Sequence, residues 1–338
     1  MMFKKFGRTA LVICILSAAV LSLPIIFTVS LHYVQKNISP MAFGQFPVTV
    51  DPKNKVIVES DHVNAFFESE KSPLQATVKN TGGAFWNIFG KLAATISKIP
   101  WYQNIAGVAG AENRFVTITP GMRKEQVANA FAIALKWNND QKIEFMTADA
   151  LATLPLSEGS FSPGIYSVTA DTTPAEAQAL VNSHFTEEIL SHYGITTAQV
   201  VPLEQALTIA SLIEREAGGA DDMRIISGII WNRIFANMKL QIDATLQYTK
   251  ASSMASGSWW PKVVPADMYR KSPYNTYLNK GLPPTPIANP SVASVLAALN
   301  PKNTTCMFYF HDNAGQFHCT DTYEEHVALL KKYFGRGK

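Results

Sequence analysis

The sequence predicts an α+β protein with three parts: a single N-terminal transmembrane helix, a small α/β N-terminal subdomain and a larger mixed α+β domain built around a candidate catalytic helix. An uncharged apolar run near the N-terminus of the 338-residue chain indicates the first part. After it, segments with strand alternation and segments with helical spacing follow each other in mixed order. Residues 203–248 give the third indication, because two helical patterns flank a break at Gly218–Gly219.

Residues 9–33 fit a membrane-spanning helix. About 20 apolar residues match a hydrocarbon core of about 30 Å. Lys4, Lys5 and Arg8 precede the run, which places residues 1–8 in the cytoplasm and the rest outside. A cleaved signal peptide is the competing interpretation, but the run is long and no A-x-A site ends it. We therefore expect a single-pass protein of the cell membrane, the inner one where there are two, with an extracytoplasmic catalytic region.

Composition and charge exclude several classes of function. The chain is 47% hydrophobic and 16% charged, which is typical of a folded protein. A net charge of +3 with no basic stripe argues against nucleic acid as a partner. The three cysteines, Cys14, Cys306 and Cys319, have no metal-ligand spacing, so we expect no metal. Nothing in the sequence predicts a nucleotide or another cofactor.

Residues 34–112 are expected to form the small subdomain. Residues 46–52 and 55–60 alternate like strands, whereas Ala84–Ile99 places apolar residues at helical spacing. We interpret this helix as the cover of a small sheet, with a helix lying on the membrane surface as the alternative.

The segment that follows combines a strand and two helices. Residues 115–119 read as a strand, Pro120–Gly121 as a turn, and the stretch up to Asn139 as a helix. A connecting helix is expected over Thr173–His192. The apolar positions assigned to the two helices are Val127, Phe131, Ile133 and Leu135, and Ala177, Leu180, Val181 and Phe185.

The first helix of residues 203–248 contains the candidate acid. At about 100° per residue, one narrow polar stripe runs along it, whereas Glu216 falls on the apolar side with Ile209 and Leu212. A carboxyl group in apolar surroundings has a raised pKa, which suits a general acid. Glu214, about 160° away, is a second candidate. The ordinary alternative is a pair of surface glutamates. The stripe consists of Glu204, Thr208, Ser211 and Arg215.

The C-terminal third contains loops and a hairpin. Ala251–Met268 is expected to be a loop whose Trp259–Trp260 pair serves either as packing surface or as a sugar-stacking platform. Gly281–Pro290 is a proline-dense loop that suits one wall of a site. Val292–Leu299 is expected to be helical, followed by a strand at Cys306–Phe310, a turn and a second strand.

Cys306 and Cys319 flank this turn. They would form a disulfide if the strands place them face to face in an oxidising exterior. The alternative is a pair of small buried apolar residues.

Several ordered segments resemble the MltG (YceG-like) family of membrane-anchored endolytic murein transglycosylases: ASLIEREA, WNRI, MKLQIDATLQY, SPYNTY, GLPPTPIANP and YEEH. The resemblance covers residues 113–338 and is strongest over 202–338. In that family the catalytic glutamate is the second of an E-x-E pair, which here is Glu216, so resemblance and helix phase select the same residue. The family also has a LysM-like subdomain near residues 34–112, whose pattern is absent here. The family's P-D-T segment is replaced at Gly164, and its histidine is shifted by one place, to His318.

The resemblance implies further site residues. Apart from the resemblance, Glu214 and Asp243 are the remaining carboxylates near the site and could stabilise oxocarbenium-like charge, although Asp243 could equally cap a turn before Thr245. The residues implied to bind substrate are Asn232, Arg233, Gln241, Thr245, Tyr248, Tyr274, Asn275 and Tyr277.

The resemblance also implies an activity, namely cleavage of MurNAc–GlcNAc β-1,4 bonds in nascent glycan strands. One glutamate acts as acid and then as base, a 1,6-anhydro end is formed, and strand elongation is limited. Peptidoglycan strands, and peptidoglycan polymerases in the membrane, are the implied partners. Two alternatives stay open. One is a muramidase that uses Asp243 or Glu214 as second carboxylate and water as acceptor, and the other is a non-catalytic peptidoglycan-binding scaffold.

Overall fold

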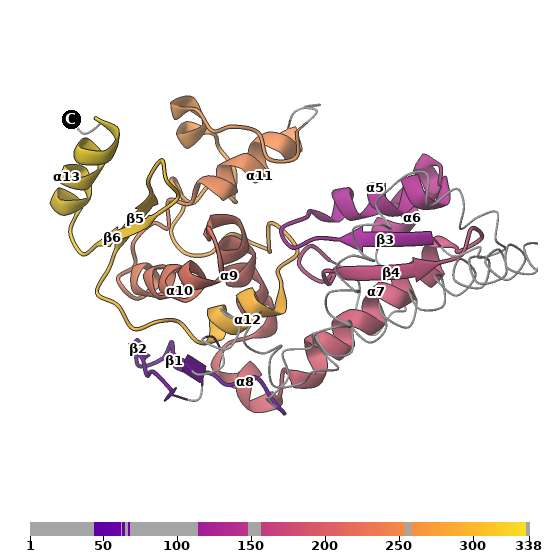
Figure 1. The fold of residues 1–338 in the computed structure, drawn as a ribbon, viewed down its shortest axis with the longest axis horizontal. Coiled ribbons are helices and arrows are strands. Elements are labelled where there is room, and N and C mark those ends of the chain that lie inside the picture. Colours follow the sequence, from indigo (N-terminus) through magenta and orange to yellow (C-terminus); the bar gives the residue numbers. More distant parts are fainter. Residues whose placement is uncertain are drawn as a thin grey trace, which may run out of the picture. The chain divides into compact units, whose positions relative to one another are not determined.

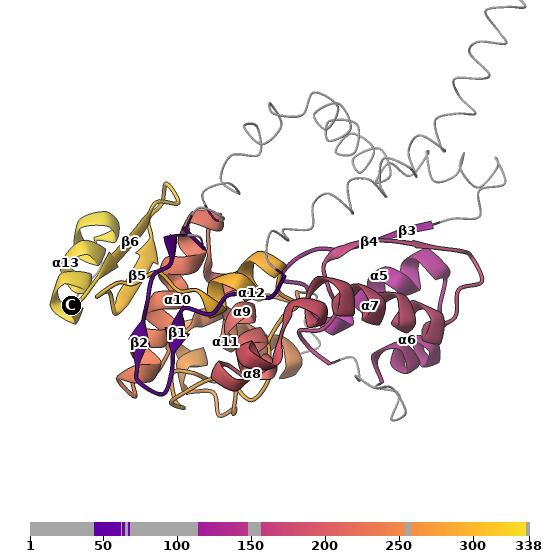
Figure 2. The same cartoon turned by 90° about the horizontal axis from the view of Figure 1, so that it is seen from below.

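The structure is a computed structural model that describes residues 44–61, 63, 64, 67, 114–147, 157–253 and 258–335. Nearly all of them belong to one compact unit, formed by residues 41–71 and 116–338. This unit is a mixed α+β structure, mostly helical with small two-stranded sheets (Figures 1 and 2). The predicted membrane span at residues 9–33 and the predicted helix at Ala84–Ile99 lie outside the described residues.

None of the helices in the described part of the chain combines the length and apolar character that crossing a membrane requires.

One part of the unit is a two-stranded sheet with helices against it. Strand β3 (Arg114–Ile118) pairs with β4 (Gly164–Val168). Helices α5 (Lys124–Leu135), α6 (Asn139–Met146) and α7 (Pro174–Glu188) accompany the sheet in Figure 1. Their shared core contains apolar residues of both strands and all three helices: Val116, Ile118, Val127, Phe131, Leu135, Phe145, Tyr166, Val168, Ala177 and Val181.

Two of the predicted apolar positions in these helices face solvent instead. Ile133 is 81% exposed and Leu180 is 42% exposed. Ile133 lies two residues after the buried Phe131, and two helical steps turn a side chain by about 200°. An apolar residue at the position of Ile133 therefore faces away from the core.

The other part of the unit is a group of helices around α9 (Leu203–Glu216). Helices α10 (Ala220–Phe235) and α12 (Val292–Leu299) pack on it, and α11 (Asp243–Ser253) lies nearby (Figure 1). The central residues of α9, Ala206–Ile213, are buried. Between α10 and α12, the indole N–H of Trp231 donates to the carbonyl oxygen of Ala298 at 2.9 Å. The predicted helix at Val292–Leu299 is confirmed.

Two of the four residues in the predicted polar stripe on α9 are buried. Thr208 and Ser211 are 2% and 0% exposed. Ser211 Oγ donates to the carbonyl oxygen of Thr208 at 2.7 Å and accepts from the backbone N–H of Ile287 at 3.0 Å. Short hydroxyl side chains are buried here because the backbone satisfies them. The stripe therefore seats the Gly281–Pro290 loop.

Helix α11 corrects two predictions. Gln241–Tyr248, which follows the two helical patterns of residues 203–248, reads in the sequence as a short polar segment, and Ala251–Met268 was expected to be a loop. In the structure, a helix covers Asp243–Ser253 and a 3₁₀ turn, η2, covers Pro265–Tyr269. The buried face of α11 includes Thr245 and Thr249, whose hydroxyls donate to the carbonyl oxygens of Ile242 and Thr245. These threonines read as polar in the sequence although the helix buries them.

The N-terminal described residues form a small hairpin. Strand β1 (Val50–Asp51) pairs antiparallel with β2 (Val56–Ile57), with Val50 opposite Ile57. Phe46 and Val50 join the same core as α9. Short helix α8 (Ile195–Val200) lies beside this segment, and Thr197 Oγ1 donates to the carbonyl oxygen of Phe46 at 3.0 Å.

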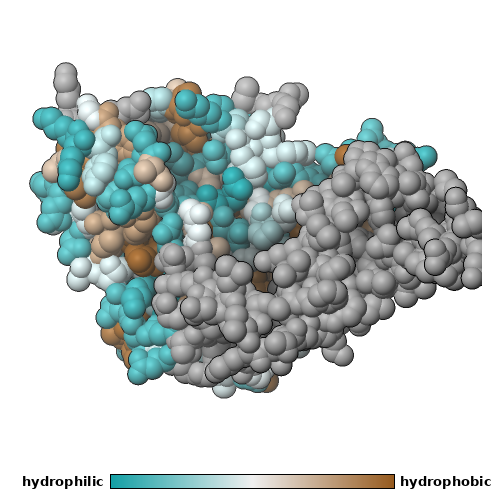
Figure 3. All heavy atoms as spheres, viewed as in Figure 1, coloured by the Kyte–Doolittle hydropathy of each residue, from teal (hydrophilic) through white to brown (hydrophobic). Residues whose placement is uncertain are grey.

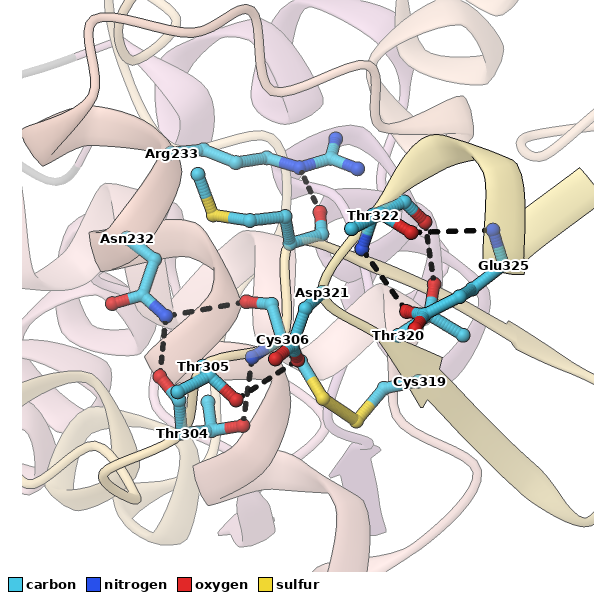
Figure 4. The surroundings of a disulfide bond; sticks show 11 residues. Asn232, Arg233, Thr304, Thr305, Cys306, Cys319, Thr320, Asp321, Thr322 and Glu325 are labelled. Atoms are coloured by element: carbon cyan, nitrogen blue, oxygen red, sulfur yellow. Dashed lines mark hydrogen bonds between the residues drawn. A yellow bond between two sulfur atoms is a disulfide. The ribbon is translucent and has the colours of Figure 1, made fainter.

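The C-terminal hairpin pairs β5 (Phe308–His311) antiparallel with β6 (Phe317–Thr320), and α13 (Tyr323–Phe334) follows it. Cys306 and Cys319 form a disulfide with Cα atoms 5.8 Å apart (Figure 4). The two residues are not direct register partners, because Cys319 is opposite Tyr309 and Cys306 precedes β5. The predicted hairpin and disulfide are confirmed, without the face-to-face register.

The visible face of the described part is predominantly hydrophilic, with separate apolar patches (Figure 3). Isolated apolar residues on a surface are ordinary.

Candidate active site

Glu216 is the last residue of α9 and is half-buried. Its Oε2 accepts a hydrogen bond of 2.9 Å from the Tyr309 hydroxyl on β5. Its Oε1 accepts a longer one, 3.4 Å, from the backbone N–H of Ala244 in the first turn of α11. The carboxyl group therefore lies where α9, α11 and β5 meet.

The chain ends α9 at this residue for a local reason. Ala217 leaves the helical conformation while its N–H still donates to the carbonyl oxygen of Ile213 at 2.9 Å. Gly218 and Gly219 follow before α10 begins, and glycines are poor helix formers. The break predicted at this pair is confirmed, and it leaves Glu216 at an open helix end.

Opposing influences act on the carboxyl group of Glu216. Burial raises its pKa above the usual range, and the negative charge of Asp243 raises it further. The hydrogen bonds from Tyr309 and Ala244 and the charge of His311 lower it. The net effect is a raised pKa of Glu216.

Asp243 and Tyr277 form a pair next to Glu216. Asp243 is exposed at the start of α11, and its Oδ1 accepts from the Tyr277 hydroxyl at 2.6 Å. Burial, followed by the bond to Asp243, raises the pKa of Tyr277 far above its usual range, so the phenol remains a donor. Asp243 therefore stays within electrostatic reach of Glu216 while its side chain is held by a neutral partner.

A histidine–aspartate pair contacts the loop after α9. Asp222, in the first turn of α10, lies 2.8 Å from His311 Nε2 of β5 through its Oδ2. The same oxygen accepts from the backbone N–H of Gly218 at 3.1 Å.

Glu214 points away from this site and caps another helix. Its Oε2 accepts from Ser291 N–H at 2.9 Å, from Ser291 Oγ at 2.6 Å and from Ser294 Oγ at 2.7 Å. These groups form the N-terminus of α12, where a negative charge is favourable. The angular separation from Glu216 expected on α9 is thus realised, with Glu214 in a structural position.

Asn232 and Arg233 hold backbone atoms ahead of β5 (Figure 4). Asn232 Nδ2 donates to the carbonyl oxygens of Thr304 at 2.7 Å and Cys306 at 3.2 Å. Arg233 Nε donates to the carbonyl oxygen of Met307 at 2.6 Å, and its Nη1 donates to that of Leu240. Both implied substrate-binding residues therefore hold the backbone segment that leads into β5, the strand that carries Tyr309.

Gln241 and Thr245 line the start of α11 differently. Gln241 is exposed with a left-handed φ of 50°, and its backbone N–H donates to the carbonyl oxygen of Thr276 at 3.2 Å. Thr245 is fully buried, with Oγ1 3.0 Å from Thr276 Oγ1. Of the two side chains, only that of Gln241 is free to reach a ligand.

Tyr248, Tyr274 and Asn275 form a separate group. The rings of Tyr248 and Tyr274 pack with centroids 4.9 Å apart, and the Tyr274 hydroxyl lies 2.8 Å from Thr285 Oγ1. Asn275 is 0% exposed, and its Nδ2 donates to the carbonyl oxygens of Met268 and Arg270. Of the eight residues implied to bind substrate, Tyr277 thus lies next to Glu216 through its bond to Asp243, whereas Asn275 is buried and bonds to the backbone.

The tryptophan pair is tied to two arginines. The guanidinium of Arg215 lies over the Trp260 ring at 4.0 Å, and that of Arg123 lies 6.0 Å from the Trp259 ring. Trp260 is half-buried and packs against the main core, whereas Trp259 is 37% exposed. This agrees with packing surface for Trp260.

Sequence reasoning missed Tyr309, His311 and Glu158. Tyr309 was part of a predicted strand, and its contact with Glu216 joins residues 93 positions apart. Glu158 is 5% exposed, and burial, followed by the charge of Glu125, raises its pKa to about 8. The one available signal was that Ser157–Val168, SEGSFSPGIYSV, resembles the E-G-x-F-x-P-D-T-Y segment of the MltG (YceG-like) family.

No group of three or more His, Cys, Asp or Glu residues that would hold a metal occurs among the described residues. The chemistry offered by these side chains is proton transfer, because a half-buried carboxyl group with a raised pKa sits beside a second carboxylate and fixed donors.

The chain is similar to known proteins in sequence. The family model described as the YceG-like family matches residues 91–332. An endolytic murein transglycosylase of Bacillus subtilis (strain 168) is 38% identical over 133 residues, which are 39% of this chain and 35% of the relative. An endolytic murein transglycosylase of Streptococcus pneumoniae is 26% identical over 170 residues, which are 50% of this chain and 31% of the relative. The matches thus span about a third of the length of these curated relatives.

A solved structure is similar as well. The crystal structure of a yceG-like protein from Listeria monocytogenes superposes with a TM-score of 0.55 at 26% sequence identity. The match covers 64% of this chain and 75% of that one.

Proposed function

Because the chain belongs to the YceG-like family, we propose that it is an endolytic lytic transglycosylase that cleaves MurNAc–GlcNAc β-1,4 bonds in peptidoglycan strands. The observation that supports this most is the environment of Glu216. Its carboxyl group combines a raised pKa with two hydrogen-bond donors that stabilise its charged form. Such a group suits a reaction in which one residue first gives and then takes a proton.

The proposed reaction has two half-steps. Protonated Glu216 gives its proton to the glycosidic oxygen as the bond from that oxygen to C1 of the MurNAc ring breaks, which frees the 4-hydroxyl of GlcNAc. The resulting carboxylate then takes the proton of the MurNAc 6-hydroxyl, whose oxygen bonds to C1. The product is a 1,6-anhydro end, Glu216 is protonated again and no water is consumed.

Asp243 has a supporting role in this proposal. Its exposed carboxylate, held by Tyr277, lies beside the carboxyl group of Glu216 and raises its pKa. A fixed negative charge at this place favours the positive charge that develops at C1. The same carboxylate is what a muramidase would use to activate water, so the products have to separate the two reactions.

The test uses the purified full-length chain in detergent on defined peptidoglycan, with mass spectrometry of the products. We expect anhydro-ended products from the wild type and none above background from Glu216→Gln, since glutamine keeps the outline of the side chain but has no proton to transfer. Glu204→Gln makes the same chemical change at an exposed position on the same helix, and it should retain wild-type rates. Reducing ends would indicate a muramidase, and absence of cleavage by the wild type would indicate a binding scaffold.

We further propose that the protein is anchored in the membrane by residues 9–33, with its catalytic region outside and peptidoglycan polymerases as neighbours, so that cleavage limits strand elongation. The Cys306–Cys319 disulfide supports an exported catalytic region, because disulfides persist in oxidising compartments. A C-terminal reporter that is active only outside the cytoplasm tests this topology, and a signal from a cytoplasm-specific reporter would refute it.

A further inference from the structure

Strand β5 places two side chains against the end of α9. Tyr309 donates to Glu216 Oε2 at 2.9 Å, and His311 Nε2 lies 2.8 Å from Asp222 Oδ2. Alternate residues of a strand point to the same face. One strand therefore contacts both the candidate catalytic carboxyl group and the first turn of α10.

The His311–Asp222 pair packs against the backbone of the loop that follows Glu216. Gly218, two residues after Glu216, donates its N–H to Asp222 Oδ2 at 3.1 Å. A Cβ atom added to Gly218 would lie 3.0 Å from that oxygen and 3.1 Å from His311 Nε2. The loop thus packs directly on the pair, and a displacement of the pair would be transmitted to the end of α9.

The electrostatic surroundings of Glu216 include His311. Its positive charge lowers the pKa of Glu216, against burial and the charge of Asp243, which raise it. The charged and titratable groups that interact with Glu216 come from several elements: Arg215 on α9, Arg233 on α10, Asp243 on α11, Tyr277 in the loop after η2, and Tyr309 and His311 on β5. His311 itself is paired with Asp222 and packs edge-on against the Phe317 ring of β6 at 5.4 Å.

We propose that His311 is a positioning residue for the cleavage reaction: held by Asp222, it fixes the loop behind Glu216 and thereby the position of the carboxyl group that gives and takes the proton. The proposal rests on the proposed function. A single acid–base group needs both of its forms within one turnover, and the electrostatic interaction with His311, which lowers the pKa of Glu216, favours the form left after proton donation.

The experiment compares full-length wild type with His311→Gln and Asp222→Asn. Glutamine keeps a donor for Asp222 but carries no charge, and asparagine removes the charge that holds the imidazole. The hairpin offers a matched control, His318→Gln, because His318 Nε2 lies 2.9 Å from Asp312 Oδ2 in a second His–Asp pair. Equal melting temperatures are verified first.

Two measurements are made on each protein. The titration of Glu216 is followed by NMR of ¹³C-labelled glutamate side chains, with the Glu216 signal assigned by its loss in Glu216→Gln. In parallel, kcat and KM for release of anhydro ends are measured across pH. The first measurement does not depend on activity, so failure of this proposal and failure of the proposed function give different results.

We expect Glu216 of His311→Gln to titrate at a higher pH than in the wild type, by about half to one pH unit. We also expect kcat to fall by about three- to tenfold with KM unchanged, since the change affects a proton transfer and not substrate binding. Asp222→Asn should change both quantities in the same direction, and His318→Gln should change neither. A Glu216 titration that is identical in wild type, His311→Gln and Asp222→Asn would overturn the proposal. Shifted titrations without cleavage by the wild type would support the role of His311 and overturn the proposed function.

Discussion

Tyr309 donates its phenolic proton to Oε2 of Glu216 at 2.9 Å, which joins the C-terminal hairpin to the last residue of α9. Burial, and the negative charge of Glu216, raise the pKa of Tyr309 well above its usual range, so the tyrosine stays a donor. The acceptor, in contrast, is a group whose own pKa is raised by burial. One fixed donor therefore stabilises the charged form of an acid whose pKa is raised by burial.

Replacing Tyr309 by phenylalanine should change the pH dependence of cleavage. The ring remains and the donor is lost, so the pKa of Glu216 should rise and the alkaline limb of the rate profile should move to higher pH. The carboxylate of the second half-step also loses a hydrogen bond, and we expect the rate at pH 7 to fall about tenfold. Rates of anhydro-end formation between pH 5 and pH 9 measure both effects.

The control for this substitution is Tyr323→Phe, on the exposed surface of α13. It makes the same chemical change without touching Glu216. A Tyr309→Phe profile that coincides with that of Tyr323→Phe would mean that the hydrogen bond has no part in catalysis.

Glu214→Gln should affect stability more than activity. Glu214 accepts three hydrogen bonds at the N-terminus of α12, and a glutamine retains an oxygen but loses the charge that favours this position. We expect the free energy of unfolding to fall by about 1–2 kcal/mol, with cleavage by the folded protein retained. Urea unfolding, compared with Glu204→Gln on the same helix, measures the loss. Loss of cleavage with unchanged stability would place Glu214 in the catalytic site instead.

The disulfide should stabilise the hairpin that carries Tyr309. Cys306 and Cys319 are separated by 13 residues, and closing a loop of this size contributes about 3 kcal/mol in the chain-entropy model. Cys319 is the register partner of Tyr309, so its loss should also loosen the contact with Glu216. We expect Cys306→Ser/Cys319→Ser to unfold at lower urea and to cleave more slowly, and Cys14→Ser to match the wild type. Free thiols at Cys306 and Cys319 in exported protein would contradict the bond.

The sequence was most informative where a pattern is local. The phase of α9 separates Glu216 from Glu214, and in the structure the first accepts a hydrogen bond from Tyr309 whereas the second has a capping role. Helix phase is a property of adjacent turns, so it can be read without tertiary contacts.

Contacts between distant segments were not accessible in this way. The bond from Tyr309 to Glu216 depends on how a hairpin packs against α9, and no periodicity reports that. Helix α11 was missed for a related reason. Its buried Thr245 and Thr249 donate their hydroxyl protons to the backbone carbonyl oxygens of Ile242 and Thr245, but in the sequence they read as polar surface residues. The implied binding residues Asn232 and Arg233 illustrate the same limit, since their clamp on residues 304–307 is a tertiary feature.

Glu158 makes a specific prediction about stability and pH. It is 5% exposed, its Oε1 accepts from Lys124 N–H at 2.9 Å and from Asn289 Nδ2 at 3.3 Å, and its Oε2 is buried without a hydrogen-bond partner among the described residues. Burial is the main cause that raises its pKa to about 8, from an ordinary value of 4.5. The folded protein therefore binds a proton here that the unfolded chain releases at lower pH.

The sign of the effect follows from this difference in proton binding. Below pH 4.5 both states are protonated, and the contribution of Glu158 is fully present. Between that value and about 8 the folded state holds more protons, so the free energy of unfolding falls as the pH rises. The loss over the whole window, from 4.5 to about 8, is of the order of 5 kcal/mol. Glu158→Gln imitates the neutral acid at every pH, so it should be close to the wild type at pH 5 and more stable than it at pH 8 and above.

Urea unfolding of both proteins between pH 5 and pH 9, with Glu144→Gln on the exposed side of α6 as control, measures the difference. A difference between Glu158→Gln and wild type that does not change with pH would show that Glu158 is ionised in the folded protein and that its buried oxygen has a partner after all.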